Sequence, residues 1–335
     1  MDFTSTAAVF HNARQPLTLE SFPIPQLAPG EALVRIRCAT ICGSDLHTIA
    51  GRRSGPTPCI LGHEMVGDLV AANNLPLPIG TRVTWSMVWS CRDCALCRLG
   101  LPSQCERRFK FGHHALGQGQ DLSGAYAQHC HLPAGTAIFP VPANVPDEVA
   151  APANCATATV AAVLRHAGDL HGQSVIVMGA GTLGLTACAM ARDAGAAQVV
   201  ALDPDPIRLA RTADFGASIA EPTPADLALD FAGTPEAAEQ ALGLLRPGGH
   251  LILAGAVFPS RPMSLSGEHM VRRMLRITGV YNYRPEDLGR ALEFLAATSY
   301  PFASLIGGRF PLTAINSAIA YAEKERPPRV AIYPL

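Results

Sequence analysis

The sequence has no excess of charge of either sign. Its 26 lysine and arginine residues balance 27 aspartate and glutamate residues, which leaves a formal net charge of -1. A protein that binds nucleic acid or an anionic membrane surface needs a basic patch, and this balance provides none. We therefore expect neither nucleic acid nor a membrane as partner, and small molecules instead.

Long apolar runs are also missing. No stretch of about 18 apolar residues occurs, so no transmembrane helix is expected. The first residues, MDFTSTAAVFHNARQP, lack the basic region and apolar core of a secretory signal peptide. These absences predict a cytoplasmic protein, and its cysteines are then expected to stay reduced.

Charged residues are few, and internal repeats are absent. Charged residues make up 16% of the chain and hydrophobic residues 48%, a composition typical of large buried cores and not of disorder. No low-complexity tract or period of 20 to 50 residues appears, which excludes a solenoid. Because 335 residues exceed one ordinary core, we predict two domains.

The texture of the sequence changes near residue 156. Before it, β-forming segments such as 32–38 and 81–85 stand between prolines and glycines, which predicts an antiparallel, barrel-like lobe. After it, short apolar strands alternate with alanine-rich helical stretches, which predicts a doubly wound parallel sheet. We also expect a helix over 286–297 and a last strand, RVAIYPL, that returns to the first lobe. The predicted parallel strands are 174–178, 199–202, 227–231, 250–254 and 275–280.

What the chain does contain is ten cysteines, four of them close together. Cys91, Cys94, Cys97 and Cys105 follow the pattern C-x2-C-x2-C-x7-C, which is typical of a tetrahedral zinc site. Four protein ligands leave no open position, so the predicted role of this zinc is structural. Two disulfides are the alternative, and the expected reducing compartment disfavours them.

A glycine-rich segment follows the first predicted parallel strand. In GAGTLG, Gly179, Gly181 and Gly184 form G-x-G-x-x-G at the head of a helix, the pattern of a dinucleotide-binding loop. The helix N-terminus would face the phosphates with free N–H groups. We expect coenzyme contacts from this loop, including Thr182 and Leu183; the alternative is a turn that binds nothing.

Asp203 lies 19 residues beyond Gly184, at the end of the next predicted strand. A carboxylate there accepts hydrogen bonds from ribose hydroxyls and repels a 2′-phosphate, so we expect NAD rather than NADP. Arg208 lies five residues further on and offers a possible contact for that phosphate, which leaves NADP as the alternative.

A second group of metal-ligand types is spread along the chain. Cys42, His63 and Cys155 would supply three ligands and leave a fourth position open, as in a catalytic zinc site. Taken singly, a cysteine or histidine is more often buried packing than a ligand.

Taken together, CGSDLH, GHE, the four-cysteine segment and GAGTLG resemble the zinc-dependent medium-chain alcohol dehydrogenases over essentially the whole chain. The resemblance implies an α/β protein with two zinc ions per chain and a homodimeric or homotetrameric state, in which the edge near residues 275–280 is a candidate pairing surface. Its mostly antiparallel, GroES-like catalytic domain would span 1–154 and 283–335, with the structural-zinc lobe near 88–112. The NAD-binding Rossmann domain would span 155–282.

The resemblance also implies roles for single residues. Cys42, His63 and Cys155 correspond to the catalytic zinc ligands, Glu64 to an alternate ligand, and Asp45 to the carboxylate that holds the ligand imidazole. Two departures are Gly43, where some members carry a pyrophosphate-binding arginine, and Asn154, where polyol-type relatives carry a glutamate. The proton relay corresponds to Ser44 and His47, the nicotinamide contact to Thr159, and the pyrophosphate contact to Arg329.

Four cysteines remain outside both ligand sets and are expected to be buried and inert. They are Cys38, Cys59, Cys130 and Cys188.

The substrate is predicted from cationic groups in two loops. Arg52, Arg53, Lys110 and His113, with His114 nearby, would converge on an anion, although solvated surface charge is an equal alternative. GRRSGPTP, FKFGHH and PANCATATVAA are similar to dehydrogenases of phosphonate catabolism, which implies a hydroxyalkylphosphonate or its aldehyde. The alternatives are a polyol or amino-alcohol dehydrogenase, and a zinc- and NAD-binding protein without activity.

Overall fold

The computed structural model describes residues 4–218 and 223–334. The chain packs as two compact units. The first comprises the residues up to Cys155, Arg284–Ala297 and the residues from Phe302 onward, and the second comprises Ala156–Tyr283 and Thr298–Pro301. Among the described residues, no helix has both the length and the apolar character needed to cross a bilayer.

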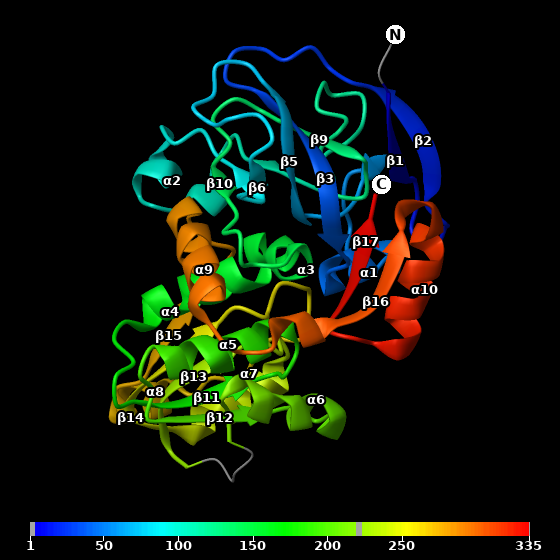
Figure 1. The fold of residues 1–335 in the computed structure, drawn as a ribbon. Coiled ribbons are helices and arrows are strands. Elements are labelled where there is room, and N and C mark those ends of the chain that lie inside the picture. The colour runs from blue at the N-terminus through cyan, green and yellow to red at the C-terminus, as the bar shows by residue number, and fades with distance from the viewer. Residues whose placement is uncertain (1–3, 219–222, 335) are drawn as a thin grey trace. The chain divides into compact units, whose positions relative to one another are not determined.

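The first unit is built around a seven-stranded sheet. Its strand order is β10-β6-β5-β3-β17-β16, with β9 also paired to β3, and only β16 and β17 run parallel. Figure 1 shows β3 and β5 side by side in this sheet. The antiparallel lobe predicted from the sequence is therefore confirmed. The strands are β3 (Ala32–Thr40), β5 (Glu64–Ala72), β6 (Arg82–Trp85), β9 (His129–Leu132), β10 (Ile138–Pro140), β16 (Ile306–Pro311) and β17 (Arg329–Tyr333).

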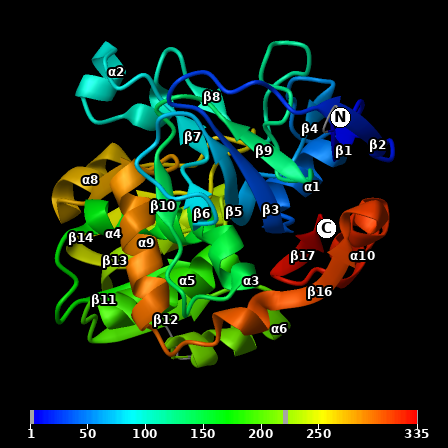
Figure 2. The ribbon, with the colours of Figure 1, turned by 45° about the horizontal axis from the view of Figure 1, so that its top comes forward.

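The last strand returns to the first lobe, as expected. In β17, Ala331 pairs with Thr40 and Ile332 with Ala39 of β3. Helix α10 packs against β16 and β17 (Figure 2). The helices of this unit are α1 (Gly43–Ile49), α2 (Ala95–Arg98), α3 (Asp147–Ala150), α9 (Pro285–Ala297) and α10 (Ile315–Glu325), with 3-10 turns at Pro102–Gln104, Ala151–Asn154, Phe302–Leu305 and Leu312–Ala314.

Two smaller strand groups complete the first unit. One is a three-stranded sheet in the order β2-β1-β4, and the other is the antiparallel pair β7 and β8, which flanks the four-cysteine segment. The largest fully buried side chains of the unit include Trp85, Phe111 and Tyr126. The strands are β1 (Thr4–Phe10), β2 (Thr18–Pro23), β4 (Cys59–Ile60), β7 (Val88–Trp89) and β8 (Phe109–Lys110).

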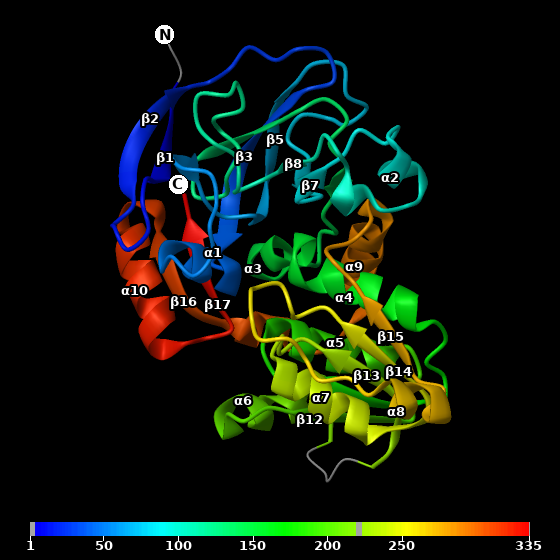
Figure 3. The same cartoon turned by 180° about the vertical axis from the view of Figure 1, so that it is seen from behind.

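The second unit is a parallel sheet in the order β12-β11-β13-β14-β15 (Figure 3). The chain passes from β11 to β12 on one side and to β13 on the other, which is the switch point of a doubly wound fold, as predicted. The elements are β11 (Ser174–Met178), β12 (Gln198–Leu202), β13 (Ala225–Asp230), β14 (Leu245–Leu253), β15 (Arg276–Gly279), α4 (Ala156–Ala167), α5 (Thr182–Asp193), α6 (Pro206–Ala210), α7 (Pro235–Leu244), α8 (Gly267–Arg273) and a 3-10 turn at Arg211–Phe215.

One strand begins earlier than its sequence indicates. β14 starts at Leu245, not at His250, and it includes the Pro-Gly-Gly stretch that predicts a turn. The pairing of β13 with β14 shifts in register between Ala225 and Leu227, so this stretch forms a bulge inside the strand. Gly248 takes a φ of 82° there, a backbone conformation that glycine adopts without strain.

Candidate functional site

The four-cysteine segment brings its sulfur atoms together. Sγ of Cys91 lies 3.9 Å from that of Cys97 and 3.5 Å from that of Cys105, and Cys94 Sγ lies 4.0 Å from Cys105 Sγ. A tetrahedron with Zn–S bonds of about 2.3 Å has edges of about 3.8 Å, whereas a disulfide bond is about 2.05 Å. All ten cysteines are free thiols. The geometry therefore fits a zinc site and not two disulfides.

Backbone N–H groups of the loop point at these sulfurs. Cys91 N–H donates to Cys105 Sγ at 3.3 Å, Cys94 N–H to Cys91 Sγ at 3.4 Å, and Arg107 N–H to Cys105 Sγ at 3.4 Å. The N–H groups of Glu106 and Cys97 lower the pKa of the Cys94 thiol to about 6, whereas burial and the neighbouring thiols raise the pKa of Cys97 to about 12. Because zinc binds the thiolate, these donors prepare the loop for the metal.

The second ligand group also assembles. Ligand atoms of Cys42, His63, Glu64 and Cys155 all lie within 4.8 Å of one another. Cys42 is the N-cap of α1, Glu64 is the first residue of β5, and Cys155 ends the 3-10 turn Ala151–Asn154. Two thiols and one imidazole form a donor set that zinc prefers, so these residues fit a zinc ion.

Asp45 lies behind His63, as the resemblance implies. Its Oδ1 is 3.3 Å from His63 Nδ1, and neither atom has another hydrogen-bond partner among the described residues. Burial opposes the charged imidazolium, but the charges of Asp45 and Cys42 raise the pKa of His63 to about 10. This orientation leaves Nε2 facing the other ligands, which is the arrangement of metal-binding histidines in general.

Arg329 has a partner that the sequence did not reveal. Its Nε and Nη2 donate to the two oxygens of Glu64, at 2.7 Å each, and Nη2 lies 3.8 Å from Cys42 Sγ. The hydroxyl of Thr40 donates to Glu64 Oε2 at 2.6 Å, and all of these side chains are buried. The contact of Arg329 with a pyrophosphate remains a prediction; the structure adds an ion pair beside the ligand group.

Ser44 and His47, the predicted relay residues, lie one helical turn apart on α1. Ser44 Oγ is 3.4 Å from Nε2 of His63. His47 Nδ1 accepts a hydrogen bond from Arg52 Nε at 2.9 Å. Burial and the positive charge of Arg52 lower the pKa of His47, which favours the neutral imidazole.

The two adjacent arginines have different partners. Arg53 Nη1 donates to His113 Nε2 at 2.7 Å, while Arg52 contacts His47. The His113 ring lies 5.5 Å from the His63 ring between centroids. Burial and the charge of Lys110, together with His63 and Arg53, lower the pKa of His113 well below its usual value. Arg53, Lys110 and His113 therefore form one group beside His63, and Arg52 belongs to His47.

Asn154, where polyol-type relatives carry a glutamate, is buried, and its amide donates to the carbonyl of Trp85 at 3.0 Å. The four other cysteines are buried, as expected. Burial raises the pKa of Cys59 and of Cys188 to about 12 and raises that of Cys38 and Cys130 further, so these thiols stay protonated.

The glycine-rich loop has the geometry of a phosphate-binding turn. Gly179 has a φ of 93°, and a Cβ on Gly184 would lie 1.7 Å from the Gly179 carbonyl oxygen. Gly181 is the N-cap of α5, and a Cβ there would meet nothing within 4 Å. The first glycine thus permits the turn, the third permits close packing, and the second leaves space over the loop.

The acid after β12 braces this loop. Asp203 Oδ2 accepts from Ala180 N–H at 2.7 Å, and its Oδ1 accepts from Asp205 N–H at 2.9 Å. Arg208 Nε lies 3.6 Å from an oxygen of Asp205. Thr182 and Leu183 form the first residues of α5, and Thr159 is buried in α4.

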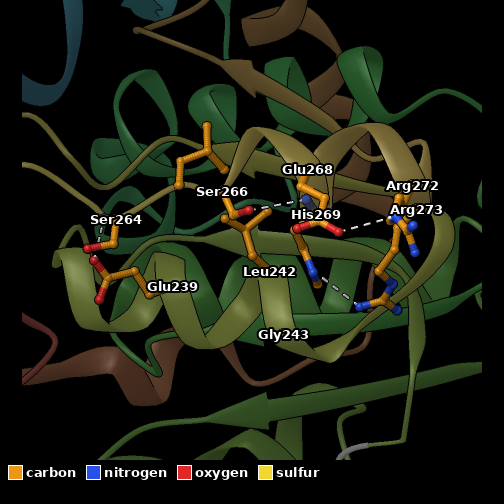
Figure 4. A pocket seen from close by; sticks show the side chains of 10 residues that line it. Glu239, Leu242, Gly243, Ser264, Ser266, Glu268, His269, Arg272 and Arg273 are labelled. Atoms are coloured by element: carbon orange, nitrogen blue, oxygen red, sulfur yellow. Dashed lines mark hydrogen bonds and ion pairs between the residues drawn. The ribbon is translucent and has the colours of Figure 1, made fainter.

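A separate groove of about 640 Å³ lies in the second unit (Figure 4). Its polar groups contact one another: Arg272 Nε lies 3.2 Å from a Glu268 oxygen, Ser264 N–H donates to Glu239 at 2.6 Å, and Arg273 donates to His269 at 3.4 Å. This groove is lined by none of the residues that the sequence predicts to bind metal, coenzyme or substrate. We assign it no ligand.

A GroES-type β unit with a Cys-His-Cys ligand group and a parallel sheet with a glycine-rich loop define a zinc-dependent dehydrogenase. Residues 28–143 match the model of the alcohol dehydrogenase GroES-like domain, and residues 182–297 match that of the zinc-binding dehydrogenases. The chain belongs to the zinc-dependent alcohol dehydrogenases of the medium-chain type, oxidoreductases that act on alcohols. The expected GroES-like and Rossmann fold class is thereby confirmed.

Similar proteins with named activities also belong to the dehydrogenases. The L-threonine 3-dehydrogenase of Edwardsiella ictaluri is 30% identical over 325 residues, covering 90% of this chain and 89% of that protein. The L-threonine 3-dehydrogenase of Coxiella burnetii is 28% identical over 324 residues, covering 90% and 91%. An alcohol dehydrogenase from Thermotoga maritima matches with a TM-score of 0.92 and 27% identity, covering 99% of this chain and 100% of the other.

Replacement of one cysteine of the four-cysteine segment tests the predicted structural zinc. We expect Cys94→Ser to lose one zinc ion per chain and to lower the unfolding temperature by several degrees, because bound zinc contributes folding energy. Metal analysis and thermal unfolding measure both effects. Cys188→Ala, a buried thiol outside both ligand groups, is the matched control; a Cys94→Ser protein with full stability and unchanged zinc would contradict the assignment.

Two glycine replacements separate packing from coenzyme binding. Gly184→Ala forces a Cβ into the Gly179 carbonyl and should reduce the free energy of unfolding by about 1–3 kcal/mol. Gly181→Ala has room for its Cβ, so stability should change by less than about 1 kcal/mol while coenzyme binding weakens. Urea unfolding and NADH titration give the two quantities. Equal effects of both changes on both quantities would refute these roles.

Proposed function

We propose that this protein is an NAD-dependent dehydrogenase that holds its catalytic zinc through Cys42, His63 and Cys155. The assembly of these ligand atoms within 4.8 Å, with Asp45 facing His63, is the observation that carries the proposal. A structural zinc in the four-cysteine segment brings the total to two per chain.

The protein side chains orient the reaction and move its proton. When bound, the catalytic zinc lowers the pKa of the alcohol hydroxyl, and NAD accepts the hydride. Ser44 Oγ accepts the hydroxyl proton as it gives up its own, and His47 passes that proton outward. Asp45 fixes the ring of His63, and Arg329 balances the negative charge of Glu64.

Asp203 supports NAD over NADP. Its carboxylate lies at the end of β12 beside the glycine-rich loop, where negative charge disfavours a 2′-phosphate. Arg208, the residue that favours NADP, lies beside Asp205, which partly balances its charge.

Arg53 and His113 support an anionic substrate. Arg53 contacts His113, and the His113 ring lies 5.5 Å from the ring of His63, so one side chain separates the guanidinium from His63. Lys110 adds positive charge to the same group. A guanidinium pairs well with a phosphonate or carboxylate. Together with the similarity to phosphonate-catabolism dehydrogenases, this favours a small hydroxyalkylphosphonate or its aldehyde. Arg52, which contacts His47, is assigned to the relay side.

An amino-alcohol substrate is the second candidate. The named relatives with 28–30% identity are L-threonine 3-dehydrogenases, and a hydroxy amino acid also presents an anionic group. The same arginine and histidine suit its carboxylate.

We also propose a cytoplasmic homodimer or homotetramer that pairs at the free edge of β15. Exposed apolar side chains flank this edge, among them Val271 and Met274, which are 78% and 72% exposed. Such side chains are typical of a surface that is covered in an assembly.

Steady-state kinetics test the substrate. We expect the kcat/KM for a hydroxyalkylphosphonate to exceed that for a plain alcohol of equal length. Arg53→Ala should lower the phosphonate value about 10- to 100-fold, because a charge-assisted hydrogen bond is lost, and should leave the plain alcohol unchanged. Equal turnover of both substrates, or no loss in Arg53→Ala, would contradict this assignment. A panel of threonine, sorbitol and butanediol identifies the second candidate.

A further inference from the structure

A buried tyrosine lies behind the carboxylate that faces His63. The hydroxyl of Tyr126, a fully buried residue, is 3.0 Å from Asp45 Oδ2. Burial and the nearby charge of Asp45 keep the pKa of Tyr126 well above its usual value, so the phenol is a donor. Nothing in the sequence indicates that Tyr126 lies beside Asp45, 81 residues earlier.

The hydrogen bonds that Asp45 accepts from Tyr126 and from the Cys42 backbone both end on the same oxygen, Oδ2. Oδ2 accepts from Tyr126 and also from the backbone N–H of Cys42 at 3.0 Å, while Oδ1 has no partner within the described ranges except His63, 3.3 Å away. A carboxylate held twice at one oxygen presents the other in a fixed direction. The carboxylate is therefore aimed at Nδ1 of His63.

We propose that Tyr126 is a positioning residue for the catalytic zinc. Its hydroxyl holds Asp45 so that Oδ1 accepts the Nδ1 proton of His63, and this hydrogen bond directs Nε2 to the metal. The inference rests on the proposed role of His63 as a zinc ligand. It extends the support of the metal one step beyond the carboxylate.

The backbone fixes the position of the hydroxyl. Tyr126 N–H donates to the carbonyl of Leu61 at 3.1 Å, and its own carbonyl accepts from Ala8 N–H at 2.7 Å. A Cβ on Gly62 would lie 2.8 Å from the Tyr126 ring, so the ring packs directly on the segment that carries His63. A residue anchored on both sides and packed against its target suits an orienting role.

The test removes the hydroxyl from the zinc-loaded enzyme. In Tyr126→Phe, we expect the catalytic zinc to pass to a chelator about tenfold faster than in the wild type. Loss of a side chain that supports a metal ligand weakens metal binding by about 10- to 100-fold, and the expected effect lies at the lower end of that range. The four-cysteine zinc in the same chain should leave at an unchanged rate and serves as internal control. Tyr321→Phe, which loses a hydroxyl bonded to the Gly307 carbonyl elsewhere in the unit, is the matched variant and should release both ions normally.

A double-mutant cycle shows whether the effect passes through Asp45. If it does, the double variant Asp45→Asn/Tyr126→Phe should release the catalytic zinc at the same rate as Asp45→Asn alone. Cobalt substituted at the catalytic site should show a shifted visible spectrum in Tyr126→Phe and not in Tyr321→Phe. Unchanged release in Tyr126→Phe, or the same acceleration in the Asp45→Asn background, would overturn the inference. A wild type that binds only one zinc would instead refute the proposed function.

Discussion

The neutralisation of buried negative charge is the constraint on which the first unit depends. Cys42 and Glu64 are buried side by side, with the half-buried Cys155 next to them, and negative charges there are costly unless they are paired. The guanidinium of Arg329 supplies the pairing with two hydrogen bonds to Glu64. Arg329 is the first residue of β17, which lies between β3 and β16, so an inner strand of the sheet also carries the counter-ion. Fold and site therefore share one element.

The two ligand groups solve the same chemical problem differently. The four-cysteine segment is local and partly exposed, and it stabilises its thiolates with backbone N–H groups of its own loop. The Cys42 group is built from distant segments, and its members are buried except for Cys155, which is half-buried. Its support comes from side chains: Asp45, Arg329 and Thr40. A closed site needs only a loop of the right spacing. A site with an open position needs a rigid frame that keeps its ligands apart from solvent.

This difference explains what could be predicted. Spacing alone indicated the four-cysteine site and the glycine-rich loop, because their functional atoms lie within one short segment. The Cys42 group required a resemblance to a family, since no local pattern joins its residues. The pairing of Arg329 with Glu64 spans 265 positions, and the contact of Tyr126 with Asp45 spans 81. Such contacts depend on how distant strands, helices and loops pack together, which a single sequence does not specify; the different partners of Arg52 and Arg53 escaped prediction for the same reason.

The ion pair also bears on Glu64 as an alternate ligand. Both of its oxygens are engaged, Oε1 by Arg329 and Oε2 by Arg329 and Thr40. To reach a metal, the carboxylate must give up these bonds and leave a buried guanidinium without its partner, at a cost of about 3–5 kcal/mol. Cys42, His63 and Cys155 would bind without breaking an ion pair to an arginine, and the Cys155 thiol, whose pKa Cys42 and burial raise, would lose its proton on binding the metal. In the resting enzyme we therefore expect three ligands from these residues, with Glu64 held back beside them and the fourth position left to the substrate.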